Sequence, residues 1–169
     1  VDAARRGNGS AMDALFRRFA PVVHGVLLGY VQKADADDLT QEVFETAMQR
    51  LGDLREAAAF PGWLLGIARH AALDAKRRRV PLTGIAIDAV DARATHEDRL
   101  DAERALAAIR SLPDAYRETL LLRLVEGLTG PEIAERSGLT AGSVRVNLHR
   151  GMALLRAALT DANTGAGVR

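Results

Sequence analysis

The chain has 169 residues, of which 48% are hydrophobic and 27% are charged, and its formal net charge is +1. This length suits one medium domain or two small ones. No apolar run approaches the roughly 20 residues that a membrane-spanning helix needs, and no secretory signal opens the sequence, so we expect a cytoplasmic protein without membrane insertion. The sequence contains no cysteine, which excludes disulfides, cysteine-ligated zinc and a thiol redox switch in this chain.

Charge is distributed unevenly along the chain. Residues 35–56 carry seven acidic and two basic side chains, whereas residues 69–79 carry five basic side chains and one acidic one. A net charge near zero does not predict nucleic-acid binding, so the local distribution is more informative than the sum. The four histidines are far apart, without the i, i+4 spacing of a helical metal pair, and we expect neither a metal site nor a cofactor.

The apolar spacing in the first half of the chain is helical. A first helix covers residues 15–30, and Pro21 should kink or split it because proline removes a backbone hydrogen bond. A second begins near Asp35, with acidic residues in its first turn, where the helix dipole favours them, and ends at Gly52. A third begins near Pro61 and ends before Pro81.

The second half of the chain has its own helical pattern. Residues 80–96 lack a helical period and predict a flexible linker, and the period resumes near Glu97 and breaks at Pro113. Residues 160–169 are predicted to be disordered. The fold class that follows is all-α, with two small helical domains over 8–79 and 97–160 joined by the linker.

The segment 129–159 predicts a helix-turn-helix. Thr129 and Glu132 have the spacing of a capping box, Gly138 is placed to adopt a left-handed turn, and Thr140 is placed to cap the next helix. A short helix, a glycine turn and a long helix are typical of a DNA-reading unit.

The second helix of this motif has two different faces. At about 100° per residue, one face is apolar and should pack inward; it comprises Val144, Leu148, Met152, Leu155 and Leu159. The opposite face is polar and suits a DNA major groove, with Arg and Asn side chains reaching base edges. An ordinary amphipathic surface helix is the alternative interpretation of the same pattern.

Three motifs together resemble the extracytoplasmic-function, or group IV, sigma factors of bacterial RNA polymerase. Residues 35–44 (DADDLTQEVF) resemble sigma region 2.2. Residues 60–69 (FPGWLLGIAR), with the basic run after them, resemble regions 2.3–2.4. Segments within 112–150, including EIA at 132–134, resemble region 4. The resemblance covers about residues 8–159, and the lack of a long segment between the two domains resembles this group.

The resemblance implies that the acidic helix docks on the coiled coil of the largest clamp subunit of core polymerase, and that the flap of the polymerase is a further contact. An acidic face suits a basic partner and repels DNA. The alternative is a solvent-exposed helix terminus whose acidic side chains only stabilise the helix dipole. Gln41 is uncharged and would have no part in that role. The implied contact residues are Asp35, Asp38, Leu39, Gln41, Glu42 and Phe44.

The resemblance also implies that the third helix and the loop before it bind the minus-10 promoter element. In this group the loop, here residues 53–60, receives a base that flips out of the opening duplex, which lowers the cost of melting without an ATPase. Trp63 is a candidate stacking platform, but its spacing with Ile67 favours core packing. The implied minus-10 residues are Arg55, Glu56, Arg69, His70, Lys76, Arg77 and Arg78.

The helix-turn-helix is implied to read the minus-35 element, and the linker to pass near the active-site channel. An anti-sigma factor that covers both domains is a further implied partner. Some residues depart from the family pattern: His70 replaces a usual Asn, Gly130-Pro131 a Ser-Tyr pair, and Val146 and Asn147 replace Ser and Arg. The implied minus-35 residues are Thr140, Ser143, Arg145, Val146, Asn147, His149 and Arg150.

Two other functions were weighed against this one. A helix-turn-helix regulator that does not recruit polymerase would have no use for an acidic helix beside a basic one. A helical enzyme using the acid pair Asp37 and Asp38 is disfavoured, because adjacent helical residues point about 100° apart and no histidine or nucleophile is placed nearby. The sequence therefore predicts a DNA-binding initiation factor that has no catalytic residue.

Overall fold

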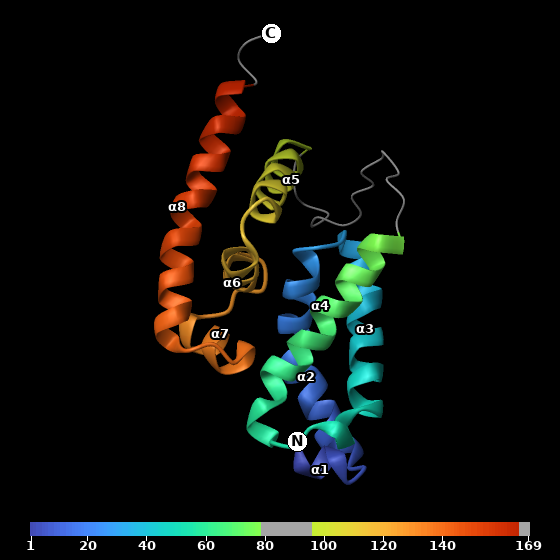
Figure 1. Cartoon of the computed structure of the whole chain (residues 1–169). Coiled ribbons are helices and arrows are strands. Elements are labelled where there is room, and N and C mark those ends of the chain that lie inside the picture. The colour runs from blue at the N-terminus through green and yellow to red at the C-terminus, as the bar shows by residue number, and fades with distance from the viewer. Residues whose placement is uncertain (79–95, 166–169) are drawn as a thin grey trace.

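The computed structural model describes residues 1–78 and 96–165, which form two helical lobes side by side (Figure 1). The predicted linker lies outside the described residues except for His96, which is the first residue of α5. The N-terminal lobe contains α1 (Asp2–Arg5), α2 (Gly9–Leu28), α3 (Lys33–Gln49) and α4 (Phe60–Arg78), with short 3-10 turns at Leu51–Asp53 and Ala57–Ala59. The C-terminal lobe contains α5 (His96–Arg110), α6 (Asp114–Leu124), α7 (Gly130–Ser137) and α8 (Ala141–Gly165).

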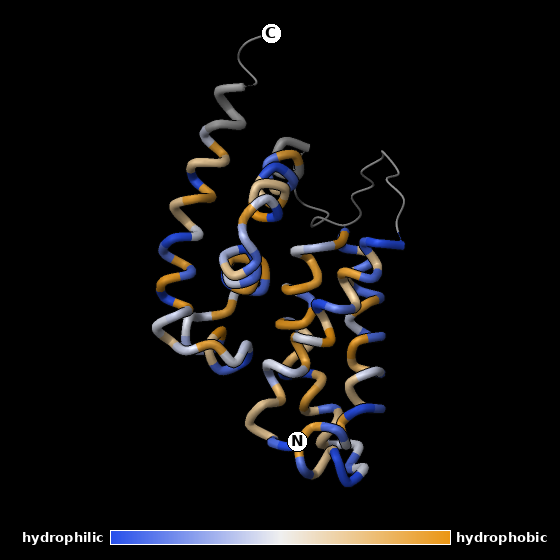
Figure 2. The backbone as a smooth tube through the Cα atoms, in the orientation of Figure 1, coloured by the Kyte–Doolittle hydropathy of each residue, from blue (hydrophilic) through white to orange (hydrophobic). Residues whose placement is uncertain are grey.

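The described part of the chain is helical and contains no strand, which confirms the predicted all-α class. Hydrophobic residues recur along α2, α3 and α4 (Figure 2), and buried apolar residues of all three helices form the core of the N-terminal lobe. The rings of Phe19 and Phe60 meet edge to face with centroids 5.2 Å apart, and Trp63 packs beside Phe60 at 6.0 Å. Each large apolar side chain buried here contributes about 1.5–3 kcal/mol relative to exposure. Trp63 is therefore a packing residue, as its spacing predicted.

Of the two predicted effects of Pro21, a kink or a split, the split does not occur: α2 continues through the proline from Gly9 to Leu28. Buried side chains stand on both sides of the proline, including Phe19, Val22, Val23 and Val26. The burial of both halves against the same neighbours outweighs the single hydrogen bond that proline removes.

Helix α8 packs against α5, α6 and α7, the other helices of the C-terminal lobe. Val144 and Leu155 are buried, and Leu148, Met152 and Leu159 pack against the same core, as predicted for this face. Gly151 allows α6 to approach closely, since a Cβ atom there would lie 3.2 Å from Leu120 and 3.3 Å from Tyr116. The predicted disorder from residue 160 is wrong for 160–165, because α8 extends to Gly165.

Local interactions define both ends of α7 and the start of α8. Thr129 and Glu132 form the predicted capping box, Gly138 adopts the left-handed conformation with φ 76°, and the Thr140 hydroxyl accepts a hydrogen bond of 3.1 Å from the backbone N–H of Ser143. The backbone N–H of Thr129, and then its hydroxyl, lowers the pKa of the Glu132 carboxyl below the ordinary 4.5.

The two lobes are in direct contact, mainly between α2 and α6 and between α4 and α7. Gly25 on α2 makes this possible, because a Cβ atom there would lie 2.9 Å from Leu122 Cδ2 and 3.0 Å from Glu126 Cγ. The described helices include none that is both long enough and apolar enough to span a membrane.

The close approach of α8 to α6 predicts a size limit at Gly151. We expect Gly151→Leu to lower the free energy of unfolding by about 1–3 kcal/mol through overpacking against Leu120. Gly142→Leu on the same helix meets only Thr140 Oγ1 at 3.9 Å and should be neutral or stabilising by up to about 1 kcal/mol. Chemical denaturation of both variants measures the difference, and equal destabilisation would contradict the packing described.

The capping box predicts a pH-dependent contribution of Glu132. A carboxyl whose folded pKa is lowered stabilises the fold above its unfolded pKa and loses that contribution as the pH falls through the folded value. The melting temperature of Glu132→Gln should therefore lie below that of the wild type at neutral pH, and the gap should shrink below pH 4.5. Thr129→Ser keeps the hydroxyl and should keep the pH response. A gap that is constant with pH would refute the assignment.

Candidate nucleic-acid interface

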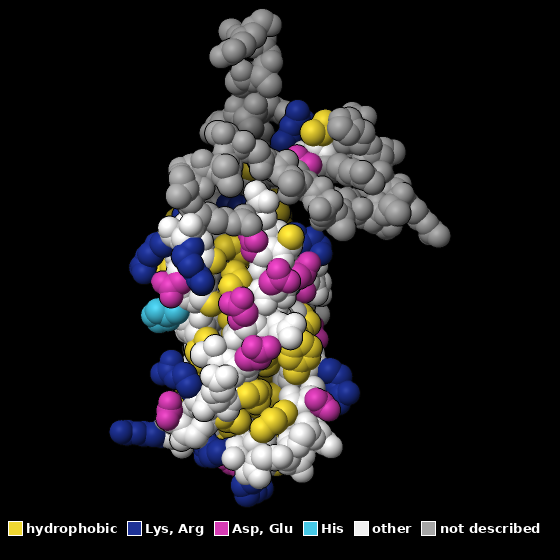
Figure 3. Space-filling model, turned by 90° about the vertical axis from the view of Figure 1, so that its right-hand side faces the viewer, with side chains coloured by type: hydrophobic (Ala, Val, Ile, Leu, Met, Phe, Trp, Pro, Cys, Tyr) yellow, Lys and Arg dark blue, Asp and Glu magenta, His cyan; other side chains and the backbone are white. Residues whose placement is uncertain are grey.

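The acidic face of the N-terminal lobe lies on α3. Asp38, Gln41 and Glu42 are exposed there, and Figure 3 shows acidic side chains gathered on this side of the molecule. Gln41 donates a hydrogen bond of 3.3 Å to Glu45, and Asp37 pairs with Lys33 at 3.0 Å. The three exposed side chains follow consecutive turns, so they form one polar surface along the helix.

Two of the predicted contact residues lie beneath this surface. Leu39 is 6% exposed and Phe44 is 4% exposed, and the Phe44 ring packs against Phe16 with centroids 4.8 Å apart. Asp35 is half-buried. Leu39 and Phe44 hold α3 in place in the core, so of the predicted contact residues only the polar ones are accessible at the surface.

The loop before α4 is built from the two 3-10 turns. Arg55 and Glu56 are exposed between them. The guanidinium group of Arg5 donates hydrogen bonds to the carbonyl oxygens of Leu51 at 3.4 Å and Leu54 at 2.5 Å. Arg5 is a residue that sequence reasoning missed, since nothing in the spacing links residue 5 to residue 54. It fixes the backbone from which the two exposed side chains project.

The basic end of α4 is exposed. Lys76, Arg77 and Arg78 occupy the last turn, where basic residues suit the negative end of the helix dipole. Arg77 pairs with Asp74 at 3.2 Å, and His70 is exposed with its Nδ1 atom 2.8 Å from the Gly66 carbonyl oxygen. These side chains project from the lobe and are accessible to phosphates.

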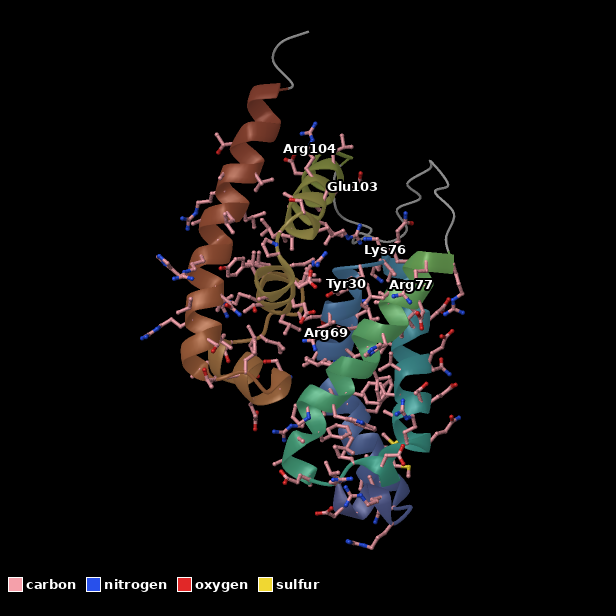
Figure 4. All side chains as sticks on the ribbon, in the orientation of Figure 1. Tyr30, Arg69, Lys76, Arg77, Glu103 and Arg104 are labelled. Carbon is pink, nitrogen blue, oxygen red and sulfur yellow. The ribbon has the colours of Figure 1, made fainter. Side chains whose placement is uncertain are left out.

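Arg69 is placed differently from the other predicted minus-10 residues. It forms a two-point ion pair with Glu118 of α6, with Nε–Oε1 and Nη2–Oε2 distances of 2.8 and 2.7 Å. The hydrogen bond to Glu118 raises the pKa of Arg69. The Tyr30 hydroxyl lies 3.1 Å from the same carboxylate, and burial raises the pKa of Tyr30, with Glu118 as the next cause. Figure 4 labels Tyr30 and Arg69 between the two lobes.

The outward face of α8 carries most of the predicted minus-35 residues. Arg145, Val146, His149 and Arg150 are exposed and share this face. Ser143 and Thr140 are exposed, with their hydroxyls 2.9 Å apart at the start of the helix.

Asn147, also predicted to read this element, is half-buried and turns toward α6. Its amide donates to the Thr119 hydroxyl at 3.4 Å.

The end of α2 is capped by the other lobe, which sequence reasoning also missed. Arg110 donates to the carbonyl oxygens of Leu28 at 2.9 Å and Val31 at 2.7 Å, and Arg117 donates to that of Gly29 at 3.3 Å. Gly29 has a φ of −68° rather than the left-handed turn that usually ends a helix. Backbone N–H groups after the helix reach the carbonyls of Val26 and Leu27, so the carbonyl of Leu28 and those just after it take other donors. Burial lowers the pKa of Arg110.

A histidine links three helical segments at the lobe boundary. His24 on α2 lies 2.7 Å from Glu126, which follows α6, and 3.1 Å from Asp37 of α3. Arg18 on α2 pairs with Glu135 of α7 at 2.5 Å. These contacts, with the capping arginines, add ion pairs and hydrogen bonds to the apolar contacts between the lobes.

A cavity of about 240 Å³ lies between α4 and the C-terminal lobe, with Arg69 and Glu118 among its lining residues. Among the described residues, no group of three or more His, Asp or Glu side chains is arranged to hold a metal ion. The polar groups described above suit the binding of a charged polymer and of a protein surface.

Comparison with known proteins matches both lobes to one family. The family model of sigma-70 region 2 matches residues 15–80, and that of sigma-70 region 4 matches residues 102–155. The RNA polymerase sigma factor CarQ of Myxococcus xanthus is 34% identical, over 93% of this chain and 94% of that protein. The ECF RNA polymerase sigma-E factor of Haemophilus influenzae is 31% identical, over 89% of this chain and 88% of that protein.

Among solved structures, CnrH in complex with the cytosolic domain of CnrY is similar, with a TM-score of 0.61 and 26% identity over 95% of this chain and 94% of that one. The N-terminal lobe is thus sigma region 2 and the C-terminal lobe sigma region 4. Because both regions match in this order and the ECF sigma-E factor is 31% identical over most of both chains, the chain belongs to the extracytoplasmic-function group of RNA polymerase sigma factors.

Proposed function

We propose that this sigma factor binds core polymerase through the exposed polar face of α3, whose contact residues are Asp38, Gln41 and Glu42. The observation that supports this most directly is the separation of charge within one lobe: the acidic face lies on α3 and the basic turn on α4. A negatively charged surface attracts a basic protein partner and repels DNA, so the two binding partners use different sides of the same bundle.

The minus-10 element is contacted by the loop at 51–59 and by α4. Arg55 and Glu56 project from a backbone that Arg5 holds in place, which suits capture of an unstacked base at a preformed site. Lys76, Arg77 and Arg78 hold the DNA backbone by charge, without reading sequence. The protein opens promoter DNA by binding its melted form, and no catalytic residue takes part.

The minus-35 element is read by α8. Arg145, His149 and Arg150 face outward on the helix after the glycine turn, the position from which a recognition helix enters a major groove. Val146 offers an apolar contact for a thymine methyl group. Asn147, which bonds to Thr119 in this structure, contributes less to base reading than its sequence position predicts.

The protein acts in the cytoplasm with two kinds of macromolecular partner besides DNA. The first is core polymerase, through its largest clamp subunit and its flap. The second is an anti-sigma protein that covers both lobes, and the similarity to CnrH, which was solved with a cytosolic domain of another protein, supports such a partner. A helix-turn-helix regulator, the alternative weighed from the sequence, would not bind core polymerase, and the next experiment tests that difference.

Core binding should depend on the charge of α3. Asp38→Arg places a positive charge against the basic partner and should weaken binding to core polymerase about tenfold or more. Asp13→Arg makes the same change at an exposed position on α2 and should leave the affinity unchanged. Fluorescence anisotropy with labelled protein measures both. A wild-type chain that fails to bind core polymerase would show that the regulator hypothesis is the better one.

The arginines of α8 should differ in their effect on promoter binding according to what they touch. Arg145→Ala or Arg150→Ala should cost about 1–3 kcal/mol and relax specificity at one base pair if the side chain reads a base. If the side chain instead holds a phosphate, its substitution should weaken binding to all sequences and lower the salt dependence of binding. Arg156→Ala, exposed farther along α8, is the control. The affinity of the holoenzyme for a library of minus-35 sequences, measured at several salt concentrations, distinguishes these effects. If Arg145→Ala and Arg150→Ala both behave like the control, the proposed role of α8 in promoter binding is contradicted.

A further inference from the structure

We propose that His70 on α4 selects one base of the minus-10 element by accepting a hydrogen bond from the amino group of adenine or cytosine. This inference rests on the proposed role of α4 in binding that element, and it adds the class of base that the helix reads. The basic side chains at the end of α4 hold the DNA backbone without reading sequence, so a base preference of this helix has to come from another residue.

The hydrogen bond of His70 to its own helix determines which ring nitrogen carries the proton. Its Nδ1 atom lies 2.8 Å from the carbonyl oxygen of Gly66, one turn earlier. A carbonyl oxygen can only accept a hydrogen bond, so Nδ1 is the protonated nitrogen. In the neutral ring the other nitrogen, Nε2, then has a free lone pair and acts as an acceptor. His70 therefore offers an incoming base an acceptor and no donor, whereas Lys76 offers only donors.

His70 lies on the same face of α4 as one of its basic residues. It is exposed, and among the described residues only Gly66 forms a hydrogen bond with its ring. At about 100° per residue, Gly66, His70 and Arg77 fall within about 40° of one another around the helix axis. Lys76 and Arg77 occupy the end of α4 (Figure 4). A DNA strand whose backbone is held there can therefore present a base to His70.

The neighbours of His70 on this face suit a base rather than a phosphate. Gly66 has no side chain, and a Cβ atom placed there would meet nothing within 4 Å, so the helix surface one turn before His70 is open to a planar ring. One turn after it, the Asp74 carboxylate pairs with Arg77 at 3.2 Å and is a second acceptor. Two acceptors one turn apart repel phosphate oxygens and attract amino groups.

The acceptor limits the bases that His70 can recognise. On the major-groove edge, adenine presents an amino donor at N6 and cytosine presents one at N4, whereas guanine and thymine present only acceptors and a methyl group. The neutral ring can therefore form a hydrogen bond with adenine or cytosine, and it meets the lone pairs of guanine and thymine oxygens. One neutral hydrogen bond of this kind changes an affinity about threefold to tenfold.

The first test measures the affinity of the holoenzyme for duplex promoters in which each minus-10 position is varied in turn. At one position the wild type should favour adenine and cytosine over guanine and thymine about threefold to tenfold. His70→Phe keeps a flat ring without nitrogens and should abolish that preference. Lys76→Ala should instead weaken binding to every sequence equally. A preference that His70→Phe leaves unchanged at every position would overturn the proposal.

The second test removes the amino group from the DNA. At the position that the scan finds, purine replaces adenine, or a cytosine analogue without its amino group replaces cytosine. The wild type should lose about threefold to tenfold in affinity, and His70→Phe should lose nothing, because the acceptor is already gone. His70→Asn should narrow the preference to adenine, since an amide pairs with adenine at two points. Equal losses for the wild type and His70→Phe would show that another residue reads the amino group.

The third test examines the ring without DNA or polymerase. NMR of the imidazole nitrogens in mildly alkaline buffer, where imidazoles are neutral, distinguishes a proton on Nδ1 from one on Nε2. The proton of His70 should lie on Nδ1. His149 is exposed on α8 and serves as the comparison, because its ring forms no such bond to the described backbone. A proton on Nε2 of His70 would overturn the proposal.

The results separate this inference from the proposed function. If wild-type protein with core polymerase binds no promoter, the proposed function fails and this inference fails with it. If the holoenzyme binds promoters but no minus-10 position depends on His70, the proposed function stands and only the base-reading role of His70 is refuted. His70 is exposed, so its substitutions remove no core packing, and a loss of base preference cannot be assigned to unfolding.

Discussion

The arrangement of the molecule depends on how the C-terminal end of α2 is satisfied. The helix ends without a left-handed glycine, and the carbonyl oxygens of Leu28, at its end, and of Gly29 and Val31, just after it, accept hydrogen bonds from Arg110 and Arg117 of the other lobe. A buried carbonyl without a donor costs about 1–3 kcal/mol. The same helix supplies Gly25 and His24 to the lobe boundary, so α2 is at once a core helix of region 2 and the platform on which region 4 rests.

The parts of the site that sequence predicted well are those set by neighbours in the chain. Thr129, Glu132, Gly138 and Thr140 act through bonds or backbone angles within four residues, so their spacing alone determines where α7 begins and ends and where α8 begins. The apolar face of α8 followed for the same reason, since helical periodicity is a local property. The charged segments on α3 and α4 likewise needed only residue order.

The parts that sequence could not predict involve partners far apart in the chain. In the sequence, Arg69 looks like the other basic residues of α4. Only the fold shows that its Nε and Nη2 atoms donate hydrogen bonds to Glu118, which is 49 positions away. Asn147 lies on the flank of the recognition helix, and only the packing of α8 on α6 turns it toward Thr119. The predicted split at Pro21 was wrong because the burial of residues on both sides of it is a tertiary effect, which local helix propensity does not include.

The hydrogen bonds of Arg5 to the loop at 51–54 have a practical consequence for work with this protein. The shape of this loop, for which base capture is proposed, depends on a residue that precedes the long helices of the bundle. An affinity tag or a shortened start near α1 would leave the core of α2, α3 and α4 intact and still alter the loop. Promoter preferences measured with such a protein would be those of a loop without its hydrogen bonds to Arg5. A tag at the C-terminus avoids this problem.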